Sequence, residues 1–287
     1  MSAQLVSAAP LAHLRWDPLG APRGVVLLLH GVGGGRGAWD DANSGTGRAL
    51  AQAGFVALAV DLPGYGLSAS IEPCSLAGMA QAVRELIDGL ALTLPNTPLA
   101  LVGHSMGGMV AQELMAASPE RVSALVLAGT SPAFGKPEGD WQAAFLKSRF
   151  APLDAGLGMA GLAAPLVAAM VAPGTPDQVQ QRAQVMMACV PEPTYRRALQ
   201  ALVAFDRRSE LARIAVPTLV ITGEHDRTAA PEVAQRMAGR IAGARLHILP
   251  SAGHLLNMEQ PEAFNAALCA FLRQALGVKN PHASAVA

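Results

Sequence analysis

Residues 103–107 read Gly-His-Ser-Met-Gly and place Ser105 at the centre of a G-x-S-x-G pattern. Glycines two positions before and after a serine allow a sharp turn from a strand into a helix, which lifts the hydroxyl above the sheet. At the positive N-terminus of that helix, the hydroxyl can act as a nucleophile. The apolar run Leu99–Val102 and the helix-type run Met106–Ala117 flank the pattern as such a turn requires. We therefore predict a nucleophilic Ser105, against the alternative of a helix N-cap.

A serine nucleophile needs a base, and the base needs an acid that orients it. Asp226 and His254 lie just after two later strand-type runs, in the order serine, acid, histidine that accompanies this kind of turn. Because parallel strands share one carboxyl edge, the three side chains can converge there. We predict that Asp226 is the acid and His254 the base. Asp206 and Asp61 are the rival acids, although Asp61 precedes a Pro-Gly loop that favours a turn role.

The oxyanion of the reaction intermediate needs two preorganised N–H donors. Met106, directly after the serine, is expected to give one. The loop His-Gly-Val-Gly-Gly-Gly of residues 30–35 is expected to give the other, from Val32 or alternatively from Gly33. For side chains of the central region, ordinary packing of short helices competes with a role in substrate binding. The residues expected to contact substrate are Gly31, Gly33, Trp141, Met186 and Leu255.

The elements that must position these residues alternate along the chain. The strand-type runs are Val25–Leu29, Phe55–Val60, Leu99–Val102, Val122–Leu127, Val216–Thr222 and Arg245–Leu249, and helix-type segments span about 44–53, 75–91, 106–117, 230–240 and 260–276. Runs that are apolar on both faces are typical of buried parallel strands. The alternation predicts an α/β fold with a doubly wound, mostly parallel sheet and right-handed crossovers. Residues 4–17 are expected to add two antiparallel edge strands.

One region, from Ser131 to Ile214, interrupts this alternation and contains no good strand. Prolines divide it into short helical pieces: Pro132, Pro137, Pro152, Pro165, Pro173, Pro176, Pro191 and Pro193. An insert that leaves from the carboxyl edge of the sheet would cover the site as a cap. We therefore predict a core formed by residues 1–131 and 215–287, with a helical cap of residues 132–214.

Composition narrows the function classes. Lysine and arginine total 21, as do aspartate and glutamate, so the balanced charge does not favour nucleic acid or anionic lipid as partners. With 51% hydrophobic and 15% charged residues, the chain is too apolar for disorder. Its most apolar stretch, Ala160–Ala172, contains Pro165 and is shorter than the roughly 20 residues that span a bilayer. We expect a buried core rather than a membrane segment.

The cysteines and the N-terminal residues bear on the compartment. Cys74, Cys189 and Cys269 lie far apart, without CxxC or Cys/His metal spacing, so we expect reduced thiols and no metal site. Residues 1–10 lack a basic region and a long apolar run, which predicts no signal peptide. Together these features favour a cytoplasmic protein.

A nucleotide site is the competing interpretation of the glycine-rich loop. Residues 33–38 contain G-x-G-x-x-A, and Asp61 ends the next strand-type run. However, three residues separate the pattern from its strand, and the next helix begins late, near Ser44. A phosphate would then meet no helix N-terminus. We therefore expect no NAD and no other cofactor.

Several of these segments together resemble the α/β-hydrolase superfamily. They are His30-Gly31, the Asp-Leu-Pro-Gly-Tyr-Gly-Leu-Ser of residues 61–68, the Gly-His-Ser-Met-Gly-Gly of 103–108, the Gly-Glu-His-Asp of 223–226 and Gly253-His254. The resemblance implies an eight-stranded core, a helical cap, and Ser105, Asp226 and His254 as nucleophile, acid and base. Residues 253–262 are similar to the enol-lactonase and small-ester hydrolase branch. The Thr-Ala-Ala-Pro of residues 228–231 departs slightly from the usual proline position after the acid.

The function expected is cofactor-independent hydrolysis of a small to medium carboxylic ester or lactone through an acyl-enzyme. A largely apolar substrate is expected because residues 156–174 of the insert are poor in charge. In the family resembled, the same fold also serves C–C bond hydrolysis, perhydrolysis, haloperoxidation and cyanohydrin cleavage, and these remain alternatives. A non-catalytic ligand-binding relative is a further one. The partner expected is a small molecule, and both a monomer and a homodimer stay open.

Overall fold

The computed structural model describes residues 2–7, 9–41, 45–135 and 140–277. Its strands are β1 (Gln4–Val6), β2 (His13–Trp16), β3 (Val25–Leu29), β4 (Val56–Val60), β5 (Leu99–His104), β6 (Ala124–Ala128), β7 (Thr218–Gly223) and β8 (Arg245–Leu249). They form one eight-stranded sheet in the order β1-β2-β4-β3-β5-β6-β7-β8. β1 and β2 pair antiparallel, as do β2 and β4, and the other neighbours pair parallel. The predicted mostly parallel sheet with an antiparallel edge is confirmed.

The strand order reverses between β3 and β5. From β3 the chain crosses to β4 on one side, and it then returns to β5 on the other side. The loops after β3 and β5 therefore diverge and leave a crevice at the carboxyl edge of the sheet, where ligands bind in open α/β sheets. These two loops contain Val32 and Ser105.

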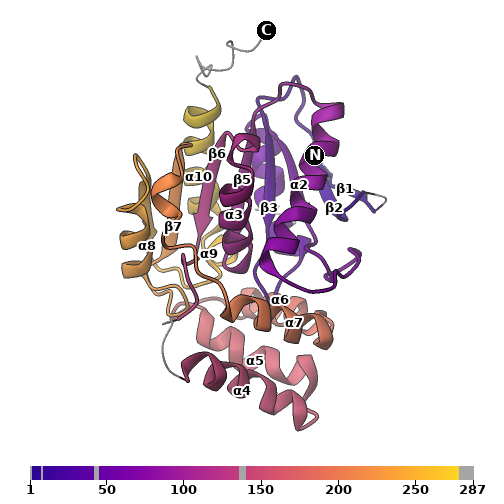
Figure 1. The fold of residues 1–287 in the computed structure, drawn as a ribbon, viewed down its shortest axis with the longest axis vertical. Coiled ribbons are helices and arrows are strands. Elements are labelled where there is room, and N and C mark those ends of the chain that lie inside the picture. Colours follow the sequence, from indigo (N-terminus) through magenta and orange to yellow (C-terminus); the bar gives the residue numbers. More distant parts are fainter. Residues whose placement is uncertain (1, 8, 42–44, 136–139, 278–287) are drawn as a thin grey trace.

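Helices cover both faces of the sheet, as Figure 1 shows. α1 (Thr46–Gln52) and α10 (Pro261–Gly277) pack on one face, and α2 (Leu76–Thr93), α3 (Met106–Ala117) and α8 (Pro231–Ala238) pack on the other. The side chains of β3 alternate between the two layers: Val25, Leu27 and Leu29 belong to one core and Val26 and Leu28 to the other. A strand buried on both faces has to be apolar at every position, which is why this run is recognisable in the sequence.

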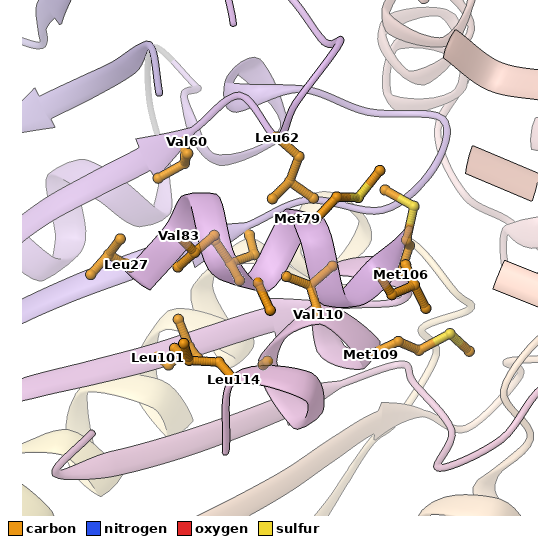
Figure 2. Close-up of a cluster of buried hydrophobic side chains, with 14 of the residues drawn as sticks. Leu27, Val60, Leu62, Met79, Val83, Leu101, Met106, Met109, Val110 and Leu114 are labelled. Atoms are coloured by element: carbon orange, nitrogen blue, oxygen red, sulfur yellow. The ribbon is translucent and has the colours of Figure 1, made fainter. Parts of the chain in front are cut away.

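The core between the sheet and helices α2 and α3 fixes the helix that follows Ser105. Figure 2 shows Met79 and Val83 of α2 beside Val110 and Leu114 of α3, with Leu101 of β5 in the same cluster. Apolar residues recur along α2 every three to four positions, so one stripe of the helix is buried. α3 therefore has a fixed position, and its first turn is held beside the end of β5.

Four helices connect β6 to β7: α4 (Trp141–Asp154), α5 (Gly158–Met170), α6 (Asp177–Ala188) and α7 (Glu192–Val203). In Figure 1 they lie together at one end of the sheet, with α6 and α7 next to it and α4 and α5 farther away. An antiparallel bridge between Ala133 and Asp206 joins the two ends of this segment, near the places where it leaves β6 and approaches β7. The division into a core and a separate cap at residues 132 and 214 stays a prediction.

Some boundaries differ from those expected. Pro152 and Pro165 lie inside α4 and α5 instead of ending helices. A proline costs a helix one hydrogen bond, which the rest of a helix of 13 or 14 residues can offset. Pro137 and the expected helix start at residue 44 lie outside the described residues. β8 is exposed over most of its length, because it is the last strand of the sheet.

Candidate active site

Ser105 occupies a strained turn between β5 and α3. Its backbone angles are φ 53° and ψ −118°, and a positive φ is costly for a residue with a side chain. The Ser105 N–H donates to the Ala128 carbonyl at 2.9 Å, and the Thr130 hydroxyl donates to the Ser105 carbonyl at 2.7 Å. The Ser105 side chain makes no capping hydrogen bond to α3. The N-cap interpretation is therefore wrong for the hydroxyl, which is available for other partners.

The glycines around Ser105 are required by close packing. A Cβ atom at Gly103 would lie 2.4 Å from the Gly107 carbonyl oxygen, and one at Gly107 would lie 2.3 Å from the Leu29 carbonyl oxygen. At Gly108 it would lie 2.6 Å from the side chain of Thr130. Real Cβ atoms do not approach other atoms so closely. The glycines therefore let α3 begin directly against β3 and β5, which fixes the serine between them.

Ser105, His254 and Asp226 form a continuous hydrogen-bonded chain. The His254 Nε2 atom lies 3.0 Å from the Ser105 hydroxyl oxygen, and its Nδ1 atom lies 2.9 Å from an Asp226 carboxylate oxygen. Asp226 follows β7, and His254 follows β8. Both residues are buried, with 2% and 3% of their surface exposed. The structure thus brings the three residues together, while their catalytic roles stay predictions.

Asp226 is held in its ionised form. Burial by itself raises the pKa of this carboxyl, but the charge of His254 and its hydrogen bond outweigh burial and bring the pKa below its usual value. The Ala229 and Thr228 N–H groups, which each donate to the carboxylate at 2.8 Å, add to this lowering. An ionised Asp226 accepts a hydrogen bond from the His254 Nδ1–H group and so leaves the Nε2 lone pair for the serine hydroxyl.

The loop that carries Val32 is braced beside the serine. His30 donates from Nδ1 to the Gly31 carbonyl at 2.8 Å and accepts at Nε2 from the Leu62 N–H at 3.1 Å. The Tyr65 hydroxyl donates to the Val32 carbonyl at 3.1 Å. A Cβ atom at Gly31 would lie 3.1 Å from Cβ of Ser105, so the loop passes close to the turn.

Two backbone N–H groups at this place, those of Val32 and Met106, donate to no backbone carbonyl among the described residues. Val32 and Ser105 line the same cavity. These are the two donors expected to hold the oxyanion, and their function stays a prediction.

The rival acids have partners elsewhere. Asp61 is buried, pairs with the Arg36 guanidinium, and accepts from the Arg36 and Leu67 N–H groups at 2.9 and 3.1 Å. Asp206 pairs with Arg208. Asp61 thereby anchors the glycine-rich loop, where the chain forms a four-residue 3₁₀ helix rather than the N-terminus of an α-helix.

A cavity of about 830 Å³ opens at Ser105 and His254 and is enclosed by residues of α4, α5, α6 and α7. Of the expected substrate contacts, Trp141 lines this cavity. A smaller cavity of about 60 Å³ shares Val32, Ser105 and His254 with it, and there the structure places the other four: Gly31, Gly33, Met186 and Leu255.

Two buried residues, His104 and Glu259, form hydrogen bonds that hold the loop of His254. His104 donates from Nε2 to the His254 carbonyl at 2.7 Å. Burial, followed by the charge of His254, lowers the pKa of His104 to about 3, so this ring is neutral. Glu259 of the short helix α9 (Leu256–Glu259) accepts from the Gly253 and Leu255 N–H groups, each at 3.0 Å, on both sides of His254.

Glu259 also binds the segment between α5 and α6. Its carboxylate accepts from the Ala172 N–H at 2.7 Å and from the Thr175 hydroxyl at 2.9 Å. The His254 N–H itself donates to the Met170 carbonyl at 2.7 Å. One buried carboxylate therefore ties the histidine loop to the helical segment above it. The only sequence signal was an acidic residue five positions after His254, which an exposed glutamate would give equally well.

Neither a metal site nor a membrane-spanning helix is found in the part of the chain that the structure describes. Among the described residues, no group of three or more histidine, cysteine, aspartate or glutamate side chains is arranged to hold a metal ion. None of the helices that the structure describes has the length and hydrophobicity required to cross a membrane.

Comparison with known proteins gives consistent matches. The family model described as "Alpha/beta hydrolase family" matches residues 26–267. A pimeloyl-(acyl-carrier protein) methyl ester esterase of Nitrosospira multiformis is 31% identical, over 86% of this chain and 94% of that protein. A 2-hydroxy-6-oxononadienedioate/2-hydroxy-6-oxononatrienedioate hydrolase of Cupriavidus pinatubonensis is also 31% identical, over 91% and 90%. The solved thermophilic esterase from Thermogutta terrifontis, with malate bound, superposes with a TM-score of 0.79 at 25% identity, over 96% and 99%.

Proposed function

The chain belongs to the alpha/beta hydrolase family, and from this premise we propose that it hydrolyses a small carboxylic ester or lactone through an acyl-enzyme on Ser105. The observation that carries the proposal is the hydrogen-bonded chain from Asp226 through His254 to Ser105 at the wall of a large cavity. The methyl ester esterase among the relatives supports ester chemistry.

In the proposed reaction, the Ser105 oxygen attacks the carbonyl carbon while His254 Nε2 takes the hydroxyl proton. Asp226 stabilises the imidazolium that forms. The Val32 and Met106 N–H groups donate to the oxyanion, and each such donor contributes roughly 3 kcal/mol of transition-state stabilisation. His254 then gives its proton to the leaving alkoxide. A water molecule, deprotonated by His254, then attacks the acyl-enzyme. The bond to the Ser105 oxygen breaks, His254 returns the proton to that oxygen, and the acid is released.

Labelling by a fluorophosphonate probe, together with turnover of p-nitrophenyl esters and lactones of graded chain length, tests the proposal. Ser105→Ala is expected to lose both labelling and turnover, because the nucleophilic oxygen is gone. The control is Ser148→Ala, which removes an exposed serine of α4 that does not line the cavity. Equal labelling of Ser105→Ala and wild type would exclude Ser105 as the nucleophile.

Cleavage of a carbon–carbon bond is the second candidate, favoured by the Cupriavidus relative. The substrate named for that hydrolase is a hydroxy-oxo-diene acid without an ester bond. If this candidate is right, a 2-hydroxy-6-oxo-dienoate is turned over and the ester panel is not. We further propose that the protein is cytoplasmic and acts on a small molecule without a cofactor, while both a monomer and a homodimer remain open.

A further inference from the structure

The lining of the large cavity is partly apolar and partly basic. Its apolar side chains include Val32, Leu166, Met170 and Met187. The lining also includes five arginines, and no aspartate or glutamate among the described residues. The arginines are Arg149, Arg208, Arg227, Arg236 and Arg240. The excess of positive charge is local, because the whole chain carries 21 basic and 21 acidic residues.

Helix α8 and the residues directly after it contribute part of this basic surface. Val233, Arg236, Met237 and Arg240 all line the cavity. Positions three, four and seven apart share one face of a helix. Three of these residues lie in α8, and Arg240 lies two residues after its end. This face therefore offers the cavity two apolar side chains alternating with two guanidinium groups. Arg227 joins them from the loop that carries Asp226.

Three of these cations have no ion-pair partner among the described residues. Arg208 pairs with Asp206, and Arg149 lies over the ring of Phe145, 5.1 Å from its centre. Arg227, Arg236 and Arg240 form no ion pair with any described residue. Guanidinium groups gathered on one wall of a cleft repel each other and attract anions, and they bind carboxylate or phosphate through paired hydrogen bonds.

On the basis of the proposed function, we propose that the substrate is an ester with an anionic group, a carboxylate or a phosphate, at the end remote from the scissile bond. Arg227, Arg236 and Arg240 would bind this group while the apolar part of the cavity holds the intervening chain. A volume of about 830 Å³ accommodates such a chain. The expectation of a largely apolar substrate is thereby refined to an apolar chain with a charged end.

The experiment compares matched methyl esters. Monomethyl succinate, adipate and suberate are measured beside methyl butanoate, hexanoate and octanoate, and a methyl ester with a terminal phosphate tests the second anion. We expect the wild type to have a kcat/KM at least about tenfold higher for the preferred anionic ester than for its neutral match. Raising the salt concentration should reduce this ratio, because the arginines are solvent-exposed and screened.

The double variant Arg236→Gln/Arg240→Gln is expected to lower the anionic-to-neutral ratio about tenfold, and Lys at both positions should restore part of it. The control is Arg273→Gln, an exposed arginine of α10 away from the cavity, which should keep the wild-type ratio. A wild-type ratio near one, or a ratio that Arg236→Gln/Arg240→Gln leaves unchanged, overturns this inference but leaves ester hydrolysis standing. If the wild type cleaves no ester and takes no fluorophosphonate, the proposed function itself fails.

Discussion

Asp226 accepts three hydrogen bonds, two from backbone N–H groups and one from His254. The backbone bonds fix the carboxylate, and the carboxylate fixes the tautomer of the histidine. Asp226→Asn keeps the size of the side chain but allows an amide to donate where a carboxylate only accepts. We expect kcat on the preferred ester to fall by about four orders of magnitude, because Nε2 then carries the proton and cannot accept another from Ser105.

Steady-state kinetics of Asp226→Asn measure this effect. The matched control is Asp61→Asn, which changes the other buried aspartate that was considered as the acid. If Asp226→Asn keeps its kcat while Asp61→Asn loses it, the acid has been assigned to the wrong residue.

The side chain of His104 is expected to make the free energy of unfolding depend on pH. Its pKa is lowered from 6.5 to about 3 by burial and by the charge of His254, so between these pH values only the unfolded chain binds this proton. Stability associated with the neutral ring is complete above pH 6.5 and decreases as the pH falls. Between pH 6.5 and about 4, we expect the free energy of unfolding to fall up to about 1.4 kcal/mol per pH unit more steeply in wild type than in His104→Gln.

Urea unfolding at a series of pH values provides the measurement. Glutamine retains an N–H donor for the His254 carbonyl but does not titrate. His247→Gln, on the exposed strand β8, is the control and should show the wild-type slope. Parallel pH curves for wild type and His104→Gln would mean that His104 does not titrate on unfolding.

At the scale of elements, α9 supports the loop of His254 through Glu259. Its carboxylate accepts four hydrogen bonds, two beside His254 and two from Ala172 and Thr175. Glu259→Gln turns one acceptor oxygen into a donor and leaves at least one buried N–H or O–H unpaired. We expect the free energy of unfolding to fall by about 2 kcal/mol. Because the His254 loop loses its brace, kcat is also expected to fall, with KM little changed.

Thermal unfolding and steady-state kinetics of Glu259→Gln test this role. The control is Glu262→Gln, an exposed acidic residue in the first turn of α10. A loss of stability with an unchanged kcat would show that Glu259 supports the fold without positioning His254.

The sequence predicted best those elements that local patterns delimit. The limits of β3, β8 and α3 were predicted to the residue, because β3 is apolar throughout, β8 is followed by Pro250, and α3 follows the Ser105 turn. β5 continues two residues beyond its apolar run, through Gly103 and His104, because both pair with β6. That pairing is a property of the neighbouring strand. The helices between β6 and β7 were predicted only as short pieces divided by prolines, and two of those prolines, Pro152 and Pro165, lie inside α4 and α5 instead of ending a helix.

The same distinction holds for the site. Ser105, Asp226 and His254 follow strand ends, so local patterns sufficed to select them. In the sequence, Glu259, Arg236 and Arg240 cannot be distinguished from ordinary charged residues of the surface. Their roles depend on contacts between elements that are distant in the sequence. Glu259 and Ala172, for example, are more than 80 residues apart, and no local pattern indicates such a contact.

At the scale of the whole molecule, the insert is clamped at its base. Phe134 donates to the Phe205 carbonyl and Arg207 to the Pro132 carbonyl, so the outgoing and returning segments lie side by side. The Arg207 guanidinium forms two hydrogen bonds to Glu113 of α3, at 2.7 and 3.1 Å. Glu113 is only 11% exposed at its side chain, so this pair is better shielded than the surface pairs.

A double-mutant cycle with Arg207→Gln and Glu113→Gln measures the clamp. We expect a coupling free energy of about 1 kcal/mol, since the pair is bidentate and partly buried. The control cycle uses Arg213 and Glu210, whose arginine is 80% exposed, and should give a coupling near zero. Equal coupling in the two cycles would show that the insert is not held by this contact.

The bond from the His254 N–H to the Met170 carbonyl has a consequence for protein engineering. The helical segment contributes one backbone acceptor to the loop of His254, so it cannot be exchanged solely for its pocket-lining side chains. A chimera that carries the insert of another hydrolase inherits a new substrate range only if the grafted chain supplies a carbonyl at the same place. Grafts that end before Met170, or that begin after Thr175, keep this acceptor and the Glu259 contacts native, and they are the junctions to choose.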